Sequence, residues 1–281
     1  MLSEDTALAG FTVLFRSCAV VLIACLLGSL PVQAATDSVQ LDELTWTEVR
    51  DALRSGATTV IIPVGGSEQN GPHMALGKHN FRAGALAARI AAKLGNTLVA
   101  PVVAYVPEGR ISPPSGHMRF PGTLSVPEDA FAAILAGASR SLKQHGFLDI
   151  VLIGDSGNYQ DILKDVALRL NREWAGSTTR AHYVAAYYRA ATDEFAQALR
   201  SRGLSEAQIG RHAGLADTSL MLAVDPARIR TELMRTAPGP EASSGVSGEP
   251  SQSSAALGGI GTDLIVDRTV QAIRAATANR R

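Results

Sequence analysis

The stretch that most constrains the fold runs from residue 58 to residue 82. Residues 58–64 are apolar and β-branched, which is typical of a parallel strand buried on both faces. Two glycines and a polar loop follow, and a helical pattern begins at Phe81, with Asn80 as its expected cap and Gly95 at its end. In open α/β sheets, ligands bind where the strands reach their carboxyl ends. The stretch therefore predicts a strand of a parallel sheet that leads into a functional loop.

The rest of the chain repeats this alternation of strand and helix. Further strands are expected at residues 97–106, 148–153 and 180–187, and helices at 46–54, 81–94, 125–144, 159–174, 193–202, 220–224 and 263–276. This order predicts an α/β fold, a three-layer α/β/α sandwich around a mainly parallel sheet. Residues 107–126 contain many glycines and prolines and are expected to form a functional or disordered loop. Composition predicts another flexible loop at residues 238–254.

The N-terminus has the features of a secretory signal peptide. An apolar run follows Arg16, and small residues precede a cleavage point near Ala35. We therefore expect residues 1–34 to be a signal peptide and residues 35–281 to form one α/β domain that is periplasmic or secreted. The alternative is a lipoprotein anchored at Cys25, because the residues up to this cysteine fit a bacterial lipobox.

Composition narrows the class of partner. The formal net charge is +0 and aromatic residues make up 5% of the chain. The sequence has no basic stripe and no aromatic residues interleaved with basic ones, so nucleic acid is not an expected partner. The leader's apolar run is short for a membrane-spanning helix, so no membrane is expected either unless Cys25 is lipid-anchored. Both cysteines lie in the predicted leader, and a cleaved chain would have no disulfide and no cysteine ligand for a metal.

Polar side chains follow two of the expected strands. Glu68, His73 and His79 come after the first strand, and Asp155 comes directly after the third. Because strand-end loops of a parallel sheet share one edge, Glu68, His79 and Asp155 are candidates to converge. Their oxygen and nitrogen atoms suit zinc or manganese. Taken singly, each favours the simpler interpretation of a loop that satisfies its own backbone, or of a helix cap at Asp155.

Other polar residues leave their roles open. His117 lies beside Arg119 in the long loop, where a histidine contacts either solvent or substrate. Ser156, with His212 as its base, suggests a serine hydrolase, but its surroundings lack the glycine pattern of a nucleophile elbow. His182 lies in an expected strand and is interpreted as structural.

Several blocks, in order, resemble the creatininase (creatinine amidohydrolase) family. They are Pro63-Val64-Gly65, Glu68-Gln69 with Gly71-Pro72-His73, Phe120-Pro121-Gly122-Thr123, Gly154 with Gly157-Asn158, and His212-Ala213-Gly214 with Thr218-Ser219-Leu220. The resemblance covers about Leu44 to Ala276. It implies a three-layer α/β fold, often assembled as a hexamer. It also implies hydrolysis of C–N bonds in small, often cyclic, amides by a water shared between two zinc or manganese ions.

The chain departs from the family pattern at the metal positions. Asn70 stands for a histidine, His79 for an aspartate, Asp155 for a histidine and Gly157 for a glutamate. The resemblance therefore implies one zinc or manganese ion per chain, held by Glu68, His79 and Asp155. His73 lies close by as a further candidate ligand.

The resemblance also implies roles for the remaining candidates. His212 stands at the family's catalytic histidine and would act as general acid or base, with Glu68 and His117 as further catalytic residues. The candidates for substrate binding are Asn70, Arg119, Ser156, Asn158 and Asp217. We expect a homo-oligomeric, metal-dependent hydrolase of a small amide, with a small molecule as its partner. The alternatives are a lactonase or esterase on the same site, and a small-molecule-binding protein that has lost catalysis.

Overall fold

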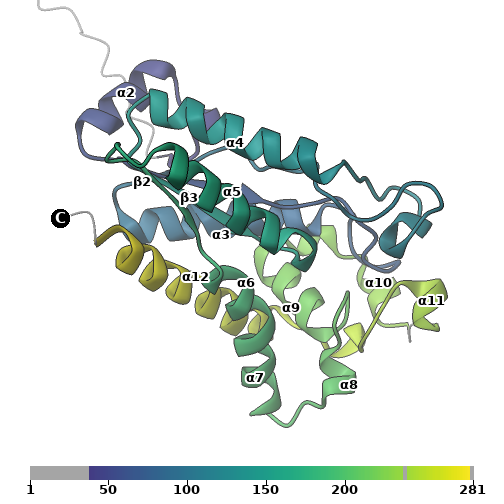
Figure 1. Ribbon diagram of the computed structural model, residues 1–281. Coiled ribbons are helices and arrows are strands. Elements are labelled where there is room, and N and C mark those ends of the chain that lie inside the picture. The colour runs from purple at the N-terminus through teal and green to yellow at the C-terminus, as the bar shows by residue number, and fades with distance from the viewer. Residues whose placement is uncertain (1–37, 237–238, 279–281) are drawn as a thin grey trace, which may run out of the picture. The chain divides into compact units, whose positions relative to one another are not determined.

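A four-stranded parallel sheet lies at the centre of the computed structural model, which describes residues 38–236 and 239–278 (Figure 1). The strands are β1 (Thr59–Val64), β2 (Thr97–Val99), β3 (Asp149–Gly154) and β4 (Arg180–Tyr183), in the order β2-β1-β3-β4. Thr59 is in register with Thr97 on one side and with Asp149 on the other. The expected mainly parallel α/β architecture is confirmed.

Helices cover both faces of the sheet because successive strand residues point to opposite sides. Val60 and Ile62 pack into one hydrophobic cluster, and Ile61 into the other. The helices on the first face are α2 (Trp46–Arg54), α4 (Glu128–Gln144) and α5 (Gln160–Glu173). Those on the second face include α3 (Lys78–Leu94), α6 (Ala186–Arg189), α7 (Phe195–Arg200), α9 (Leu215–Val224) and α12 (Ala255–Ala278).

The helix after β1 begins earlier than the sequence predicts. Asn80 lies within the first turn of α3 and does not cap it. Its side-chain oxygen instead accepts a hydrogen bond from the backbone nitrogen of Gly66 at 2.9 Å. Gly77 precedes the helix instead. Two further polar residues, Lys78 and His79, therefore join the buried side of α3.

Two strands are shorter than predicted. β2 ends at Val99, two residues before Pro101, whose missing N–H group weakens a strand. One further bridge, between Val64 and Val103, continues that side of the sheet. β4 ends at Tyr183 because Ala185 already has the helical backbone conformation that leads into α6.

The glycine-rich stretch near residue 245 is more ordered than its composition suggests. It contains α11 (Glu241–Ser244) and a turn of 3-10 helix (Pro250–Gln252). Between them, the backbone of Ser247 pairs with that of His212, whose carbonyl accepts its N–H at 2.8 Å. The segments α8 (Glu206–Ile209) and α10 (Thr231–Met234) complete this end of the structure.

The long helix α12 packs closely against α9. A Cβ atom at Gly258 would collide with the backbone carbonyl of Ser219, so only glycine permits this approach. Within the described ranges, no helix combines the length and the hydrophobicity that crossing a membrane requires. The predicted leader, including Cys25, lies outside those ranges.

Candidate active site

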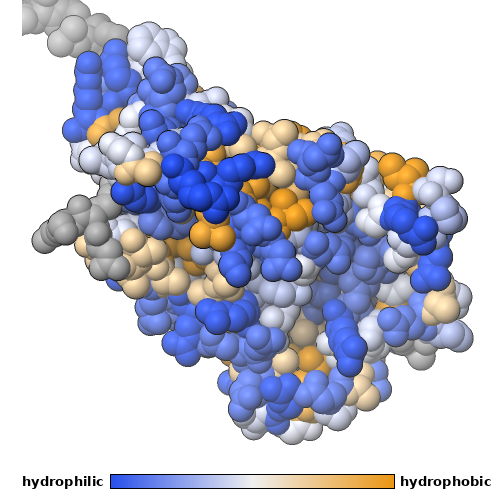
Figure 2. Space-filling view, viewed as in Figure 1, coloured by the Kyte–Doolittle hydropathy of each residue, from blue (hydrophilic) through white to orange (hydrophobic). Residues whose placement is uncertain are grey.

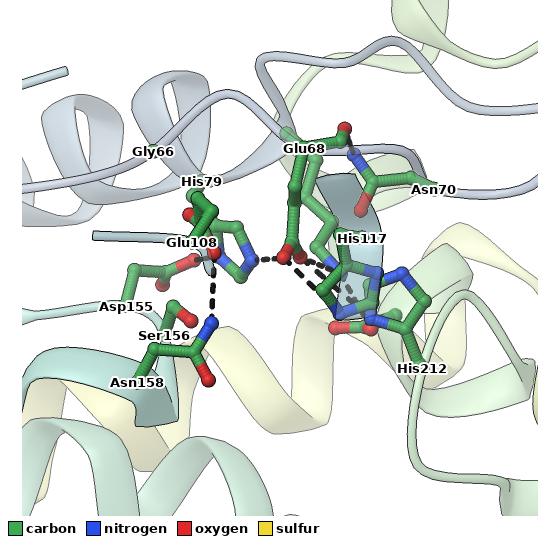
Figure 3. Close-up of polar contacts among 12 residues, drawn as sticks. Gly66, Glu68, Asn70, His79, Glu108, His117, Asp155, Ser156, Asn158 and His212 are labelled. Carbon is green, nitrogen blue, oxygen red and sulfur yellow. Dashed lines mark hydrogen bonds and ion pairs between the residues drawn. The ribbon is translucent and has the colours of Figure 1, made fainter. Parts of the chain in front are cut away.

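The carboxyl ends of β1 and β3 meet at a polar cavity of about 230 Å³. Glu68 is in the loop after β1, and Asp155 follows β3 directly. Loops from elsewhere in the chain bring His117 and His212 to the same place (Figure 3). Ser156, Asn158 and Asp217 also line this cavity, so most of the predicted site residues converge.

His79 lies between two carboxylates. Its Nε2 atom is 2.8 Å from Oε1 of Glu68, and its Nδ1 atom is 2.6 Å from Oδ2 of Asp155. An ionised carboxylate only accepts hydrogen bonds, so both ring nitrogens donate and the ring is a cation. Burial and the charge of Lys78 lower the pKa of His79, but Glu68 and Asp155 outweigh them and the pKa is raised.

Two more cations from α3 lie beside this pair. Nζ of Lys78 is 2.8 Å from Asp217 and 3.6 Å from Glu68, and the lysine is only 1% exposed. Nε of Arg82 donates to both oxygens of Asp155, at 2.9 and 2.8 Å, and Nη1 donates to Asp217 at 2.9 Å. Burial would raise the pKa of Asp217, but these two cations hold it well below its usual value.

Glu68 also lies close to two further histidines. Its Oε2 atom is 3.4 Å from Nε2 of His117, and its Oε1 atom is 3.7 Å from Nδ1 of His212. One ligand atom from each residue lies within 4.8 Å of the others. Burial lowers the pKa of His117, and lowers that of His212 to about 3, so both rings are neutral. Burial raises the pKa of Glu68, but His79 and Lys78 bring it well below its usual value.

Gln69 orients both histidines. Nε2 of His212 donates to the backbone oxygen of Gln69 at 2.8 Å, which leaves the lone pair of Nδ1 facing Glu68. The side-chain nitrogen of Gln69 donates to Nδ1 of His117 at 2.8 Å and to the carbonyl of Gly245 at 3.1 Å. In this arrangement Nε2 of His117 carries the hydrogen, and binding a metal ion through Nε2 requires the other tautomer.

The donor set suits one metal ion. A carboxylate and two neutral imidazoles are three protein ligands of the kind that hold catalytic zinc and leave a position for water. In the described part of the chain, the side-chain oxygen of Asn70 is buried without a hydrogen-bond partner, and this amide points toward the two histidines (Figure 3). Asp155, by contrast, already receives hydrogen bonds from His79, Arg82 and the Tyr187 hydroxyl.

Two predicted site residues lie apart from this cluster. His73 is buried and pairs its Nε2 atom with the Thr218 hydroxyl at 2.9 Å, and burial lowers its pKa to about 4. Arg119 ends a 3-10 turn and lines an adjoining cavity of about 480 Å³ together with Gln69, Phe120 and the two histidines. The ligand roles predicted for His73, His79 and Asp155 stay predictions.

Several residues of the site carry no clear signal in the sequence. Lys78 and Arg82 stand at i and i+4 on α3, on either side of His79, but long charged side chains are expected at the surface. Glu108 comes from the long loop and receives a hydrogen bond from Asn158 at 2.8 Å. Burial and the nearby Glu68 raise the pKa of Glu108 to about 8.

Known proteins resemble this chain in sequence and in fold. A family model described as creatininase, creatinine amidohydrolase, matches residues 42–273. Creatinine amidohydrolase of Pseudomonas putida is 31% identical over 195 residues, which are 67% of this chain and 73% of that protein. The structure of a creatininase variant superposes with a TM-score of 0.74 at 25% identity, over 86% of this chain and 99% of the other. A structure described as creatininase Mn gives 0.69 at 26% identity, over 85% and 99%.

Proposed function

This chain belongs to the creatininase family of metal-dependent amidohydrolases, and we propose that it hydrolyses a C–N bond in a small amide with one zinc or manganese ion per chain. Glu68, His117 and His212 would hold the ion. The observation that carries the proposal is their grouping, with ligand atoms within 4.8 Å of one another at the cavity wall. This assignment makes ligands of the two histidines to which the family resemblance gave catalytic roles.

The chemistry of the proposed site divides between the ion and the chain. A bound zinc or manganese ion would acidify a water molecule and polarise the amide carbonyl. His79 keeps Glu68 ionised and fixes its orientation through the hydrogen bond of 2.8 Å. The backbone oxygen of Gln69 fixes the tautomer of His212, as residues behind metal-binding histidines commonly do.

The substrate is proposed to enter by the cavity of about 480 Å³ that opens beside the two histidines. Its volume lies within the usual range for small-molecule sites. Phe120 offers an apolar wall, while Arg119 offers hydrogen-bond donors. Ser156 and Asn158 are polar groups of the smaller cavity, which the two histidines also line.

Metal content and activity, measured together, test the proposal. Elemental mass spectrometry should find about one zinc or manganese ion per wild-type chain. A panel of small linear and cyclic amides, lactones and esters should reveal amide cleavage first. His117→Ala and His212→Ala should lose both metal and activity, whereas His145→Ala, at the exposed end of α4, should keep both.

Other results would change the assignment. Full metal content in an inactive His212→Ala protein would return His212 to the role of general acid or base. A wild-type protein that binds no ion after reconstitution would refute the metal-dependent mechanism. Tight binding of an amide without turnover would support the binding-protein alternative.

A further inference from the structure

We propose that Lys78 and Arg82, which flank His79 on α3, form a built-in cation cluster that takes the place of a second metal ion. The inference rests on the proposed function for the first ion and adds a reason why a second is not bound. The three residues lie on the first turns of α3, and each is at most 4% exposed.

The contacts within the cluster leave little for an additional ion to bind. Each of the three side chains touches two carboxylates: Lys78 reaches Glu68 and Asp217, His79 reaches Glu68 and Asp155, and Arg82 reaches Asp155 and Asp217. The formal charges of Lys78 and Arg82 balance those of Asp155 and Asp217, which leaves the charge of Glu68 for the first ion. A divalent ion placed between Asp155 and Asp217 would add two positive charges that neither of these two carboxylates is free to balance.

The position of the cations argues against a role that serves the helix alone. The first turn of a helix carries partial positive charge, which disfavours cations, and α3 has no acidic residue there. Buried lysine and arginine are rare unless they are paired. The cations are therefore held at this helix end by the carboxylates that they neutralise.

The sequence pattern gives the cluster its link to metal binding. The resemblance described above implies a carboxylate ligand at the position of His79 and a histidine ligand at that of Asp155. In the structure these two side chains bind each other at 2.6 Å. Asp155 is also bound by Arg82, with Nη2 at 2.7 Å, so its carboxylate oxygens are turned to the cations of α3.

The test is to remove one charge of the cluster and count the ions. Isothermal titration with Mn²⁺ or Zn²⁺ on the full chain should find one ion in the wild type. Lys78→Gln leaves Glu68 and Asp217 with excess negative charge, so a second ion should bind at least about tenfold more tightly than any second ion on the wild type. Lys78→Arg should behave as the wild type does.

Lys93→Gln is the matched control. Lys93 is on the same helix and pairs with Asp267, but it is exposed, so this variant should bind one ion. If Lys78→Gln does not fold, His79→Asp supplies the alternative test, because it restores a carboxylate at that position and should also admit a second ion.

The outcomes separate this inference from the proposed function. Two ions of similar affinity in the wild type would overturn the cluster's role while leaving a metal-dependent enzyme. A folded Lys78→Gln or His79→Asp protein that binds no more metal than the Lys93→Gln control would also overturn it. An ion bound by Lys78→Gln, but none by the wild type, would support the cluster and refute the proposed metal-dependent function.

Discussion

At the scale of single residues, the burial of Glu108 should make the free energy of unfolding depend on pH. It is 4% exposed, and its raised pKa of about 8 follows from burial and from the charge of Glu68. The folded protein therefore retains a proton that an unfolded chain releases near the ordinary glutamate value of 4.5. Because the folded state binds more protons in this window, the free energy of unfolding should fall as pH rises from 4.5 to about 8.

Replacing Glu108 with glutamine should remove this pH dependence. The free energy of unfolding of Glu108→Gln, minus that of the wild type, should therefore increase with pH. The limiting slope of this difference is about 1.4 kcal/mol per pH unit. Urea unfolding of chelator-treated protein between about pH 5 and pH 9 would measure it. Glu128→Gln, an exposed change on α4, should keep the wild-type dependence. Parallel curves for Glu108→Gln and the wild type would contradict the prediction.

Some residues of the site could be placed from the sequence, and others are positioned by contacts between distant parts of the chain. Glu68, His79 and Asp155 could be brought together from the sequence because strand-end loops share a sheet edge. Gln69 could not be assigned its role, because that role depends on His117, 48 residues away, and Gly245, 176 residues away. No local pattern encodes such contacts.

At the scale of secondary-structure elements, the contact of α12 with α9 gives a sharp prediction. Gly258→Ala forces the two backbones apart and should destabilise the protein by about 1–3 kcal/mol. Gly259→Ala is the matched control, because a Cβ there meets nothing within 4 Å, and it should stabilise the helix by up to about 1 kcal/mol. Chemical denaturation would measure both. Equal effects of the two changes would mean that the helices do not pack as described.

The accuracy of the predicted elements follows the strength of local signals. Helix α2 runs from Trp46 to Arg54 as predicted, because Thr45 caps it, and in the structure Glu48 completes a capping box with Thr45. α3 was predicted to begin three residues late, because Asn80 was assigned as a cap while its side chain instead serves Gly66. Composition alone also hid α11, because glycine and serine obscured a short helical turn.

At the scale of the whole molecule, metal removal should lower thermal stability moderately. A ligand at about a hundred times its dissociation constant stabilises the folded state by about 2.7 kcal/mol, or about 5–10 °C in Tm for a domain of this size. Thermal unfolding with Mn²⁺ and with chelator would measure this. His212→Ala should have the same Tm with Mn²⁺ and with chelator. A wild-type Tm that is also the same under both conditions would contradict the proposed site.

The assembly and location of the molecule stay predictions. The surface over α4 and α5 is largely hydrophilic with apolar side chains among them (Figure 2), and Ile134 and Leu168 are 48% and 47% exposed there. Homo-oligomer formation and export by a leader were expected from the sequence. Light scattering and the mass of the exported protein would test them, with cleavage near Ala35 or lipidation at Cys25 as the alternatives.

The buried lysine and arginine of α3 have a consequence for how the protein meets a changing environment. A metal ion reaches each molecule by exchange, so its occupancy follows the supply. Lys78 and Arg82 are encoded in the gene and arrive with every copy of the chain. When zinc or manganese is scarce, we therefore expect inactive molecules that stay folded. They should regain activity when the metal is supplied again, without new protein synthesis.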